Sequence, residues 1–164
     1  MKPAAGCMDD FGEFYAVTKD GVFRAILVAT GDRAGAEDAS AEAYARACAR
    51  WSRLREHPNP KAWVLRTALN VRRSWWRRTR RELLGAVPEH GAEDTASIDL
   101  DADLRRAVAA LPTRQREVVA LRVLADLSAE DTGELLGIAP ATVHVHLHRA
   151  LSALRLQFGE EVVG

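Results

Sequence analysis

Apolar residues recur at intervals of three and four along the first half of the chain, which is the spacing of one face of an α-helix. These intervals predict helices over residues 11–30, 36–54 and 60–83. Between them, Gly31-Asp32 is a turn signal, and the sequence HPNP at residues 57–60 ends the second helix. A stripe of alanines along the second helix would let a neighbouring helix approach closely.

The second half of the chain repeats this spacing in shorter pieces. A helix over residues 100–111 is expected to end at Pro112, and a further helix carries apolar side chains from Val118 to Ala125. The next helix is predicted over residues 129–136 because Ser128 stands in the capping position before it.

A Gly-containing turn separates that short helix from the last one. Gly137 supplies the left-handed residue that commonly ends a helix, and Pro140 opens a regular amphipathic helix that reaches Phe158. A short helix, a tight turn and a longer helix are the outline of a helix-turn-helix, whose second helix enters the DNA major groove. Any helical hairpin shares this outline, so the pattern alone leaves DNA binding open.

The pattern predicts an all-α protein. No alternation of β-branched residues is long enough for a sheet, and a stretch rich in Gly, Pro and acid interrupts the helices. We therefore expect two small helical domains joined by a flexible acidic linker. The expected parts are a disordered lead-in at 1–8, a first domain at 9–83, the linker at 84–99, a second domain at 100–159 and a tail at 160–164.

Charge is distributed unevenly along the chain. The 164 residues contain 23 Lys and Arg and 23 Asp and Glu, so the formal net charge is zero. Residues 51–90 nevertheless carry a net charge of +7, and residues 91–104 carry −5. Such segregation favours a polyanion as a partner of the basic segment.

The third predicted helix contains most of this positive charge. An apolar stripe includes Val64, Val71 and Trp75, and the opposite face is polar and basic: Arg66, Asn70, Arg73, Arg77 and Arg80, widened by Arg72, Arg78 and Arg81. Solvated faces usually interleave acids at i,i+4, and this face does not. Phosphate binding is therefore the favoured interpretation, and a solvated face in an arginine-rich sequence is the alternative. Trp76 either packs at the edge of the core or stacks on a base.

Other function classes find little support. We expect no enzyme, because the sequence has no phosphate-cradling Gly loop and no nucleophile-base pair. No cofactor is implied, and His144 with His148, one helical turn apart, lacks the further ligands of a metal site. The two cysteines and the absence of a long apolar run fit a cytoplasmic protein without membrane insertion.

Several short motifs, taken in order, resemble one family. They are residues 11–15, 36–38 and 42–51, then Pro60 to Val64 leading to Ala68-Leu69-Asn70, and in the second half residues 110–112, 115–117, 136–138, 141–143 and 147–150. In this order and spacing the chain resembles the bacterial sigma factors of the extracytoplasmic-function group. These are the smallest sigma-70 proteins and contain only the domains called sigma-2 and sigma-4.

The resemblance implies a non-catalytic subunit that binds core RNA polymerase and directs promoter-specific initiation. Its implied partners are the β′ clamp helices and β flap of the polymerase, promoter DNA, and an anti-sigma factor as a further candidate. The implied polymerase-binding residues are Asp38, Glu42 and Tyr44.

The resemblance also divides promoter recognition between the two domains. The loop from Leu54 to Pro60 and the arginine helix would open the minus-ten element and capture a flipped base of one strand. The implied minus-ten contacts are Asn59, Arg66, Asn70, Arg73, Trp76, Arg77 and Arg80. The last helix would read the minus-thirty-five element through Thr142, His144, His146 and Arg149.

Two segments depart from the family pattern. The polymerase-binding segment has Ala and Ser between Asp38 and Glu42, where an aliphatic residue and Gln are usual. The last helix has His144 and His146 at places where Lys and Arg are common. The alternatives are a sigma-like regulator that does not direct initiation and a stand-alone helix-turn-helix protein, which would bind DNA without polymerase.

Overall fold

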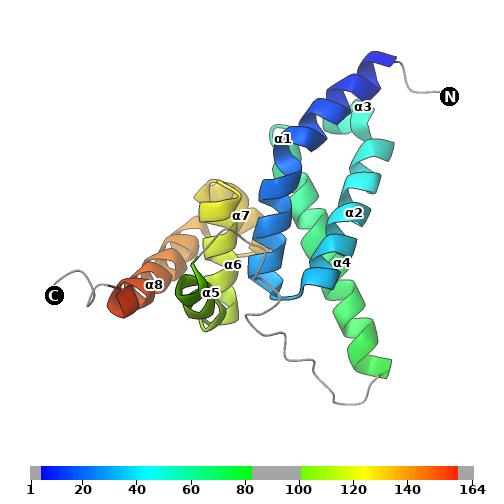
Figure 1. Cartoon of the computed structure of the whole chain (residues 1–164). Coiled ribbons are helices and arrows are strands. Elements are labelled where there is room, and N and C mark those ends of the chain that lie inside the picture. The colour runs from blue at the N-terminus through cyan, green and yellow to red at the C-terminus, as the bar shows by residue number, and fades with distance from the viewer. Residues whose placement is uncertain (1–4, 83–100, 159–164) are drawn as a thin grey trace.

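The computed structural model describes residues 5–82 and 101–158, and every regular element in these ranges is a helix (Figure 1). The first domain contains α1 (Ala5–Thr30), α2 (Arg33–Ala49), α3 (Trp51–Leu54) and α4 (Pro60–Glu82). The second contains α5 (Ala102–Ala109), α6 (Thr113–Val119), η2 (Ala120–Leu124), α7 (Ala129–Leu136) and α8 (Pro140–Phe158). The predicted all-α class is confirmed. The predicted linker and tail lie outside the described residues, and residues 5–8, expected in the lead-in, form the start of α1.

The alanine stripe of α2 forms the centre of the first domain. Ala36, Ala39, Ala43 and Ala47 are fully buried, and α2 packs along α4, whose Val64 is equally buried. The small side chains allow this close approach, as the sequence predicts. Helix α2, which carries Asp38 and Glu42, is therefore packed directly on helix α4, which carries the arginines.

The predicted second helix is interrupted at Arg50, which differs from the expectation of one helix over residues 36–54. Arg50 leaves helical geometry with φ −115° and ψ 13°, and α3 starts at the next residue. The break turns Trp51 into the core, where its ring lies 4.9 Å from that of Phe14 and 5.4 Å from that of Phe11. Burial of these aromatic rings explains why the chain bends here.

The second domain contains the predicted helix-turn-helix. The Ser128 hydroxyl accepts a hydrogen bond from Asp131 N at 3.0 Å and so caps α7. Gly137 ends this helix at φ 70°, a left-handed conformation that glycine adopts without strain. Both local predictions are confirmed, and α8 packs on α6 and α7.

The helix before α7 ends in a wide π turn that the sequence did not predict. Ala125 N donates to Ala120 O, five residues back, at 3.1 Å. The chain then passes through Asp126 at φ 53°, and the Arg122 guanidinium donates to Leu127 O. This turn brings the chain to the start of α7.

The two domains pack against each other through α1. Figure 1 shows α1 between the α2–α4 side and the second domain, and α1 contacts both η2 and α6. Buried residues of both domains form one continuous hydrophobic cluster. No helix in the described ranges is long and apolar enough to cross a membrane.

Candidate nucleic-acid interface

The predicted basic stripe lies on the outer face of α4. Arg66, Asn70, Arg77 and Arg80 are exposed and Arg73 is half-buried, and the stripe follows the three- and four-residue spacing of one helix face. Within the described residues, no acid forms an ion pair with Arg77 or Arg80, whereas Arg66 and Arg73 each have a partner. The far half of the stripe therefore carries arginines without a carboxylate partner among the described residues, as a phosphate-binding surface requires.

Arg72 does not belong to this face, which corrects the expectation that it widens the stripe. Its guanidinium forms an ion pair of 2.5 Å with Asp32, and both side chains are only 14% exposed. Asp32 also caps α2 by accepting a hydrogen bond from Gly35 N at 3.1 Å. The pair ties the start of α2 to the middle of α4 and has a structural role.

The adjacent tryptophans Trp75 and Trp76 of α4 differ in their exposure. Trp75 packs partly buried against the core. Trp76 is 37% exposed, and the Arg80 guanidinium lies 5.0 Å from the centre of its ring. A cation over an aromatic face leaves the other side of the ring able to contact a base.

A pocket of about 650 Å³ opens beside the first turn of α4. The predicted loop supplies one part of its wall, including His57, and Trp63 of α4 supplies an aromatic part. Two arginines that the sequence analysis did not select, Arg50 and Arg53, also line it. Glu56 also lines the pocket, so its two arginines outnumber one acid, and an aromatic wall with a net positive charge beside it suits an unpaired base and its phosphate. In the sequence, these arginines stand on either side of Trp51. The net charge of the segment does not indicate that they lie beside the loop.

Asn59 joins this pocket region to the start of α4. Its Oδ1 accepts a hydrogen bond from Ala62 N at 3.1 Å and caps the helix. Its Nδ2 points to the second domain and donates to Asp131 Oδ2 at 2.9 Å. The predicted contact residue is thus fixed in orientation.

The predicted polymerase-binding residues divide into two groups. Asp38 is exposed on α2, and Glu42, one turn later, forms a surface ion pair of 2.8 Å with Arg46. Tyr44 is buried, and its hydroxyl lies 2.8 Å from Thr18 Oγ1. Burial raises the pKa of Tyr44 to about 12. Only Asp38 and Glu42 are placed to touch a partner, and Tyr44 supports the helix beneath them.

The predicted reading residues of α8 do not all share one surface. Thr142, His146 and Arg149 follow one another at intervals of four and three, whereas His144 lies about 160° around the helix from His146. His146 is half-buried, and its Nδ1 is buried without a hydrogen-bond partner. Two residues that the prediction omitted, Val145 and His148, lie on the exposed face between His144 and Arg149.

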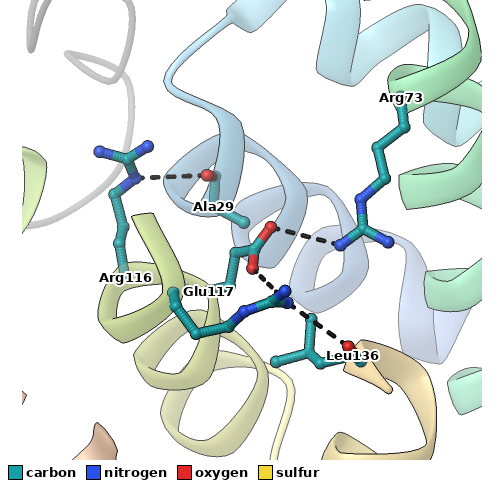
Figure 2. Close-up of polar contacts among 6 residues, drawn as sticks. Ala29, Arg73, Arg116, Glu117 and Leu136 are labelled. Carbon is teal, nitrogen blue, oxygen red and sulfur yellow. Dashed lines mark hydrogen bonds and ion pairs between the residues drawn. The ribbon is translucent and has the colours of Figure 1, made fainter. Parts of the chain in front are cut away.

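Acids of the second domain lie over part of the basic stripe. Arg73 of α4 reaches Glu117 of α6 at 3.4 Å, and Arg66 reaches Glu134 of α7 at 3.5 Å (Figure 2 shows the first pair). Of the acidic residues predicted in or near the linker, Asp99 lies outside the described residues, and Asp101 caps α5 by accepting from Asp103 N at 2.8 Å. In the described ranges no three His, Cys, Asp or Glu residues lie close enough to hold a metal ion.

The helices and faces define a two-domain protein with a basic helix in the first domain and a helix-turn-helix in the second. The family model for sigma-70 region 2 matches residues 15–82, and the model for sigma-70 region 4 matches residues 101–154. The RNA polymerase sigma-E factor of Streptomyces coelicolor is 32% identical over 149 residues, covering 89% of this chain and 84% of the relative. The SigW factor of Bacillus subtilis is 24% identical and covers 93% of this chain and 90% of the relative.

A solved structure has the same fold over most of the chain. The sigma factor RpoE of Bartonella quintana, solved in complex with the anti-sigma factor NepR, matches with a TM-score of 0.73 at 24% identity and covers 92% of this chain and 97% of that one. The chain belongs to the extracytoplasmic-function group of the sigma-70 family of RNA polymerase sigma factors. It is therefore a transcription initiation factor, and such factors are not enzymes.

Proposed function

We propose that this sigma factor recognises promoters through two separate surfaces. The pocket beside α4 and the basic stripe of α4 bind the separated strand of the minus-ten element, and the exposed face of α8 reads the minus-thirty-five element. The polymerase side of the protein is α2 with Asp38 and Glu42, together with contacts of the second domain to the β flap. Because its partner polymerase acts in the cytoplasm, the protein acts there too.

The observation that carries this proposal is the position of the pocket at the start of the basic helix. A base that leaves the duplex needs an aromatic or apolar wall to replace its stacking partners, and the phosphates on both sides need positive charge. Trp63 provides the wall, Arg50 and Arg53 lie at the pocket, and Arg77 and Arg80 continue the positive surface along α4.

The domain boundaries follow from the same division. We assign residues 9–83 to sigma-2, 84–99 to the linker and 100–159 to sigma-4. The RpoE relative was solved with an anti-sigma factor, and we propose a protein of this kind as a further partner of this chain.

The test uses core RNA polymerase, the purified chain and a library of templates with randomised minus-thirty-five and minus-ten positions. Sequencing of the transcripts is expected to show one enriched pair of elements. Trp63→Ala and the pair Arg77→Gln with Arg80→Gln should lower open-complex formation on the selected promoter. Arg24→Gln, which removes an exposed arginine of α1, is the matched control and should behave as the wild type.

The two proposed surfaces are distinguished by the step of initiation that each set of variants impairs. The α4 variants should lower the yield of opened promoter, which is measured by the permanganate reactivity of unpaired thymines. The Arg149→Gln variant should instead lower initial binding to duplex DNA. Full open-complex formation by the α4 variants would contradict the assignment of the minus-ten surface.

A further inference from the structure

Helix α8 has an outward crest, formed by Val145 and His148, on the side opposite its packing against the second domain. The buried residues of α8 are Val143 and Ala150. With about 100° of rotation per residue, Val145 and His148 lie on the opposite side of the helix, within an arc of about 60°. Both residues are exposed. Among the side chains of this helix they therefore stand far from the core, where a DNA groove would meet them first.

An apolar side chain occupies this crest. Val145 is 46% exposed, and it is one of two large apolar side chains that α8 exposes along its described length. The other, Leu156, lies about 16.5 Å farther along the helix axis. In a helix-turn-helix, residues near the N-terminus of the second helix contact the base edges. Val145 is therefore the large apolar side chain of α8 that is placed at the bases.

The chemistry of Val145 matches one base. Each base pair shows its own pattern in the major groove, and thymine is the base that shows a methyl group there. A valine neither donates nor accepts a hydrogen bond, so it gains from contact with that methyl and loses where it covers a polar base edge. Bidentate recognition of guanine needs the parallel N–H groups of a guanidinium, which valine and histidine lack.

The residues beside the crest are placed to contact the DNA strands. His144 and Arg149 are exposed, and they are separated by about 140° around the helix with the crest between them. Phosphates border the groove on both sides, and contacts to phosphate position a helix without reading sequence. Arg149 is thus suited to position α8, which leaves base reading to the crest.

We propose that Val145 is a specificity-determining residue, which selects a thymine in the minus-thirty-five element by contact with the C5 methyl group of that base. This inference rests on the proposed reading role of α8. His148 lies about 4.5 Å along the helix axis from Val145 and faces the neighbouring base pair, because base pairs are stacked about 3.4 Å apart.

The test compares duplex promoters that differ by one methyl group. The promoter selected from the template library is prepared with each thymine of its minus-thirty-five element replaced in turn by deoxyuridine, which lacks the methyl and keeps every hydrogen-bonding group. Binding of core polymerase carrying the sigma factor is measured by fluorescence anisotropy at fixed salt. One replacement is expected to lower the affinity of the wild type about fourfold, as loss of one buried methyl-sized group does.

The methyl group also affects the stacking and hydration of DNA itself, so its contact with Val145 is isolated by a cycle with Val145→Ala. Alanine favours a helix more than valine does, and α8 is therefore preserved. This variant should bind the thymine and deoxyuridine promoters with affinities within a factor of about 1.5. The matched control Val123→Ala removes the same two methyl groups from an exposed valine of η2, and it should keep the discrimination of the wild type.

Arg149→Gln provides a contrast, because loss of a phosphate contact weakens binding to all sequences alike. It should lower the affinity for the thymine and deoxyuridine promoters by the same factor. A deoxyuridine penalty that Val145→Ala leaves unchanged, or an element in which no single methyl affects binding, would overturn the inference and leave α8 as the reading helix. Failure of the proposed function differs from this result, because the template library would then yield no enriched minus-thirty-five sequence.

Discussion

The ion pair between Asp32 and Arg72 makes a measurable prediction about how the first domain is held together. Asp32→Asn keeps an oxygen that accepts from Gly35 N, so the cap of α2 survives. The Arg72 guanidinium, however, loses its carboxylate partner at 2.5 Å, and its Nε is already buried without a hydrogen bond. The substitution therefore leaves the largely buried positive charge of Arg72 without this carboxylate.

The magnitude follows from burial. Removing one partner of a fully buried pair costs about 3–5 kcal/mol, and with both side chains 14% exposed some water reaches the site, so we expect about 2–3 kcal/mol for Asp32→Asn. For a chain of this length that corresponds to a decrease of about 6–9 °C in Tm. Asp32→Ala also removes the cap and should cost about 1 kcal/mol more.

The assay is a double-mutant cycle that combines Asp32→Asn with Arg72→Met. Urea unfolding monitored by circular dichroism gives the free energy of unfolding of each variant. Arg72→Met removes the charge and keeps an apolar stem of similar length, so the double variant Asp32→Asn with Arg72→Met should be more stable than Asp32→Asn alone. Strict additivity of the two free-energy changes, or a loss below about 0.5 kcal/mol for Asp32→Asn, would refute the reasoning.

Three further predictions concern single positions. Gly35→Ala should destabilise the protein by about 2 kcal/mol in urea unfolding, because its Cβ would lie 2.6 Å from Arg72 Nε and closer still to the Asp32 carboxylate. Gly137→Ala should cost about 1–2 kcal/mol through its φ of 70° alone, since nothing lies within 4 Å of the added Cβ, and Gly137→Asn should cost less. The free energy of unfolding should fall as pH rises from about 10 to 12, because the unfolded chain ionises Tyr44 at its ordinary pKa while burial keeps it neutral in the folded state up to about 12. Tyr44→Phe should flatten that fall in a series of urea titrations and cost about 1 kcal/mol at neutral pH through the lost bond to Thr18.

Local patterns of the sequence were sufficient for the helices and their ends. The alanine stripe of α2, the Ser128 cap and the left-handed Gly137 each depend on neighbours within a few residues, and the structure has all of them. The break at Arg50 was missed because it depends on rings far away in the sequence. Trp51 packs on Phe11 and Phe14, and the helical spacing of residues 36–54 contains no information about that contact.

The errors at the candidate site have the same origin. Spacing places Arg72 next to the basic stripe, but its orientation depends on Asp32, which is forty positions earlier. Tyr44 was expected on the surface, and its burial follows from contacts with Tyr15 and Thr18 of another helix. The hydrogen bond between Asn59 and Asp131 joins residues 72 positions apart, and no helical pattern encodes it.

The two proposed DNA surfaces differ in how far other parts of the chain cover them. The carboxylates of α6 and α7 cover the pocket-side half of the α4 stripe, whereas Figure 1 shows α8 directed away from the first domain. The open surface is also the weaker one, since Arg149 is the only fixed positive charge among residues 140–150. The helix proposed to read the minus-thirty-five element is thus exposed and carries little positive charge, whereas carboxylates pair with two arginines of the helix proposed to bind the minus-ten element.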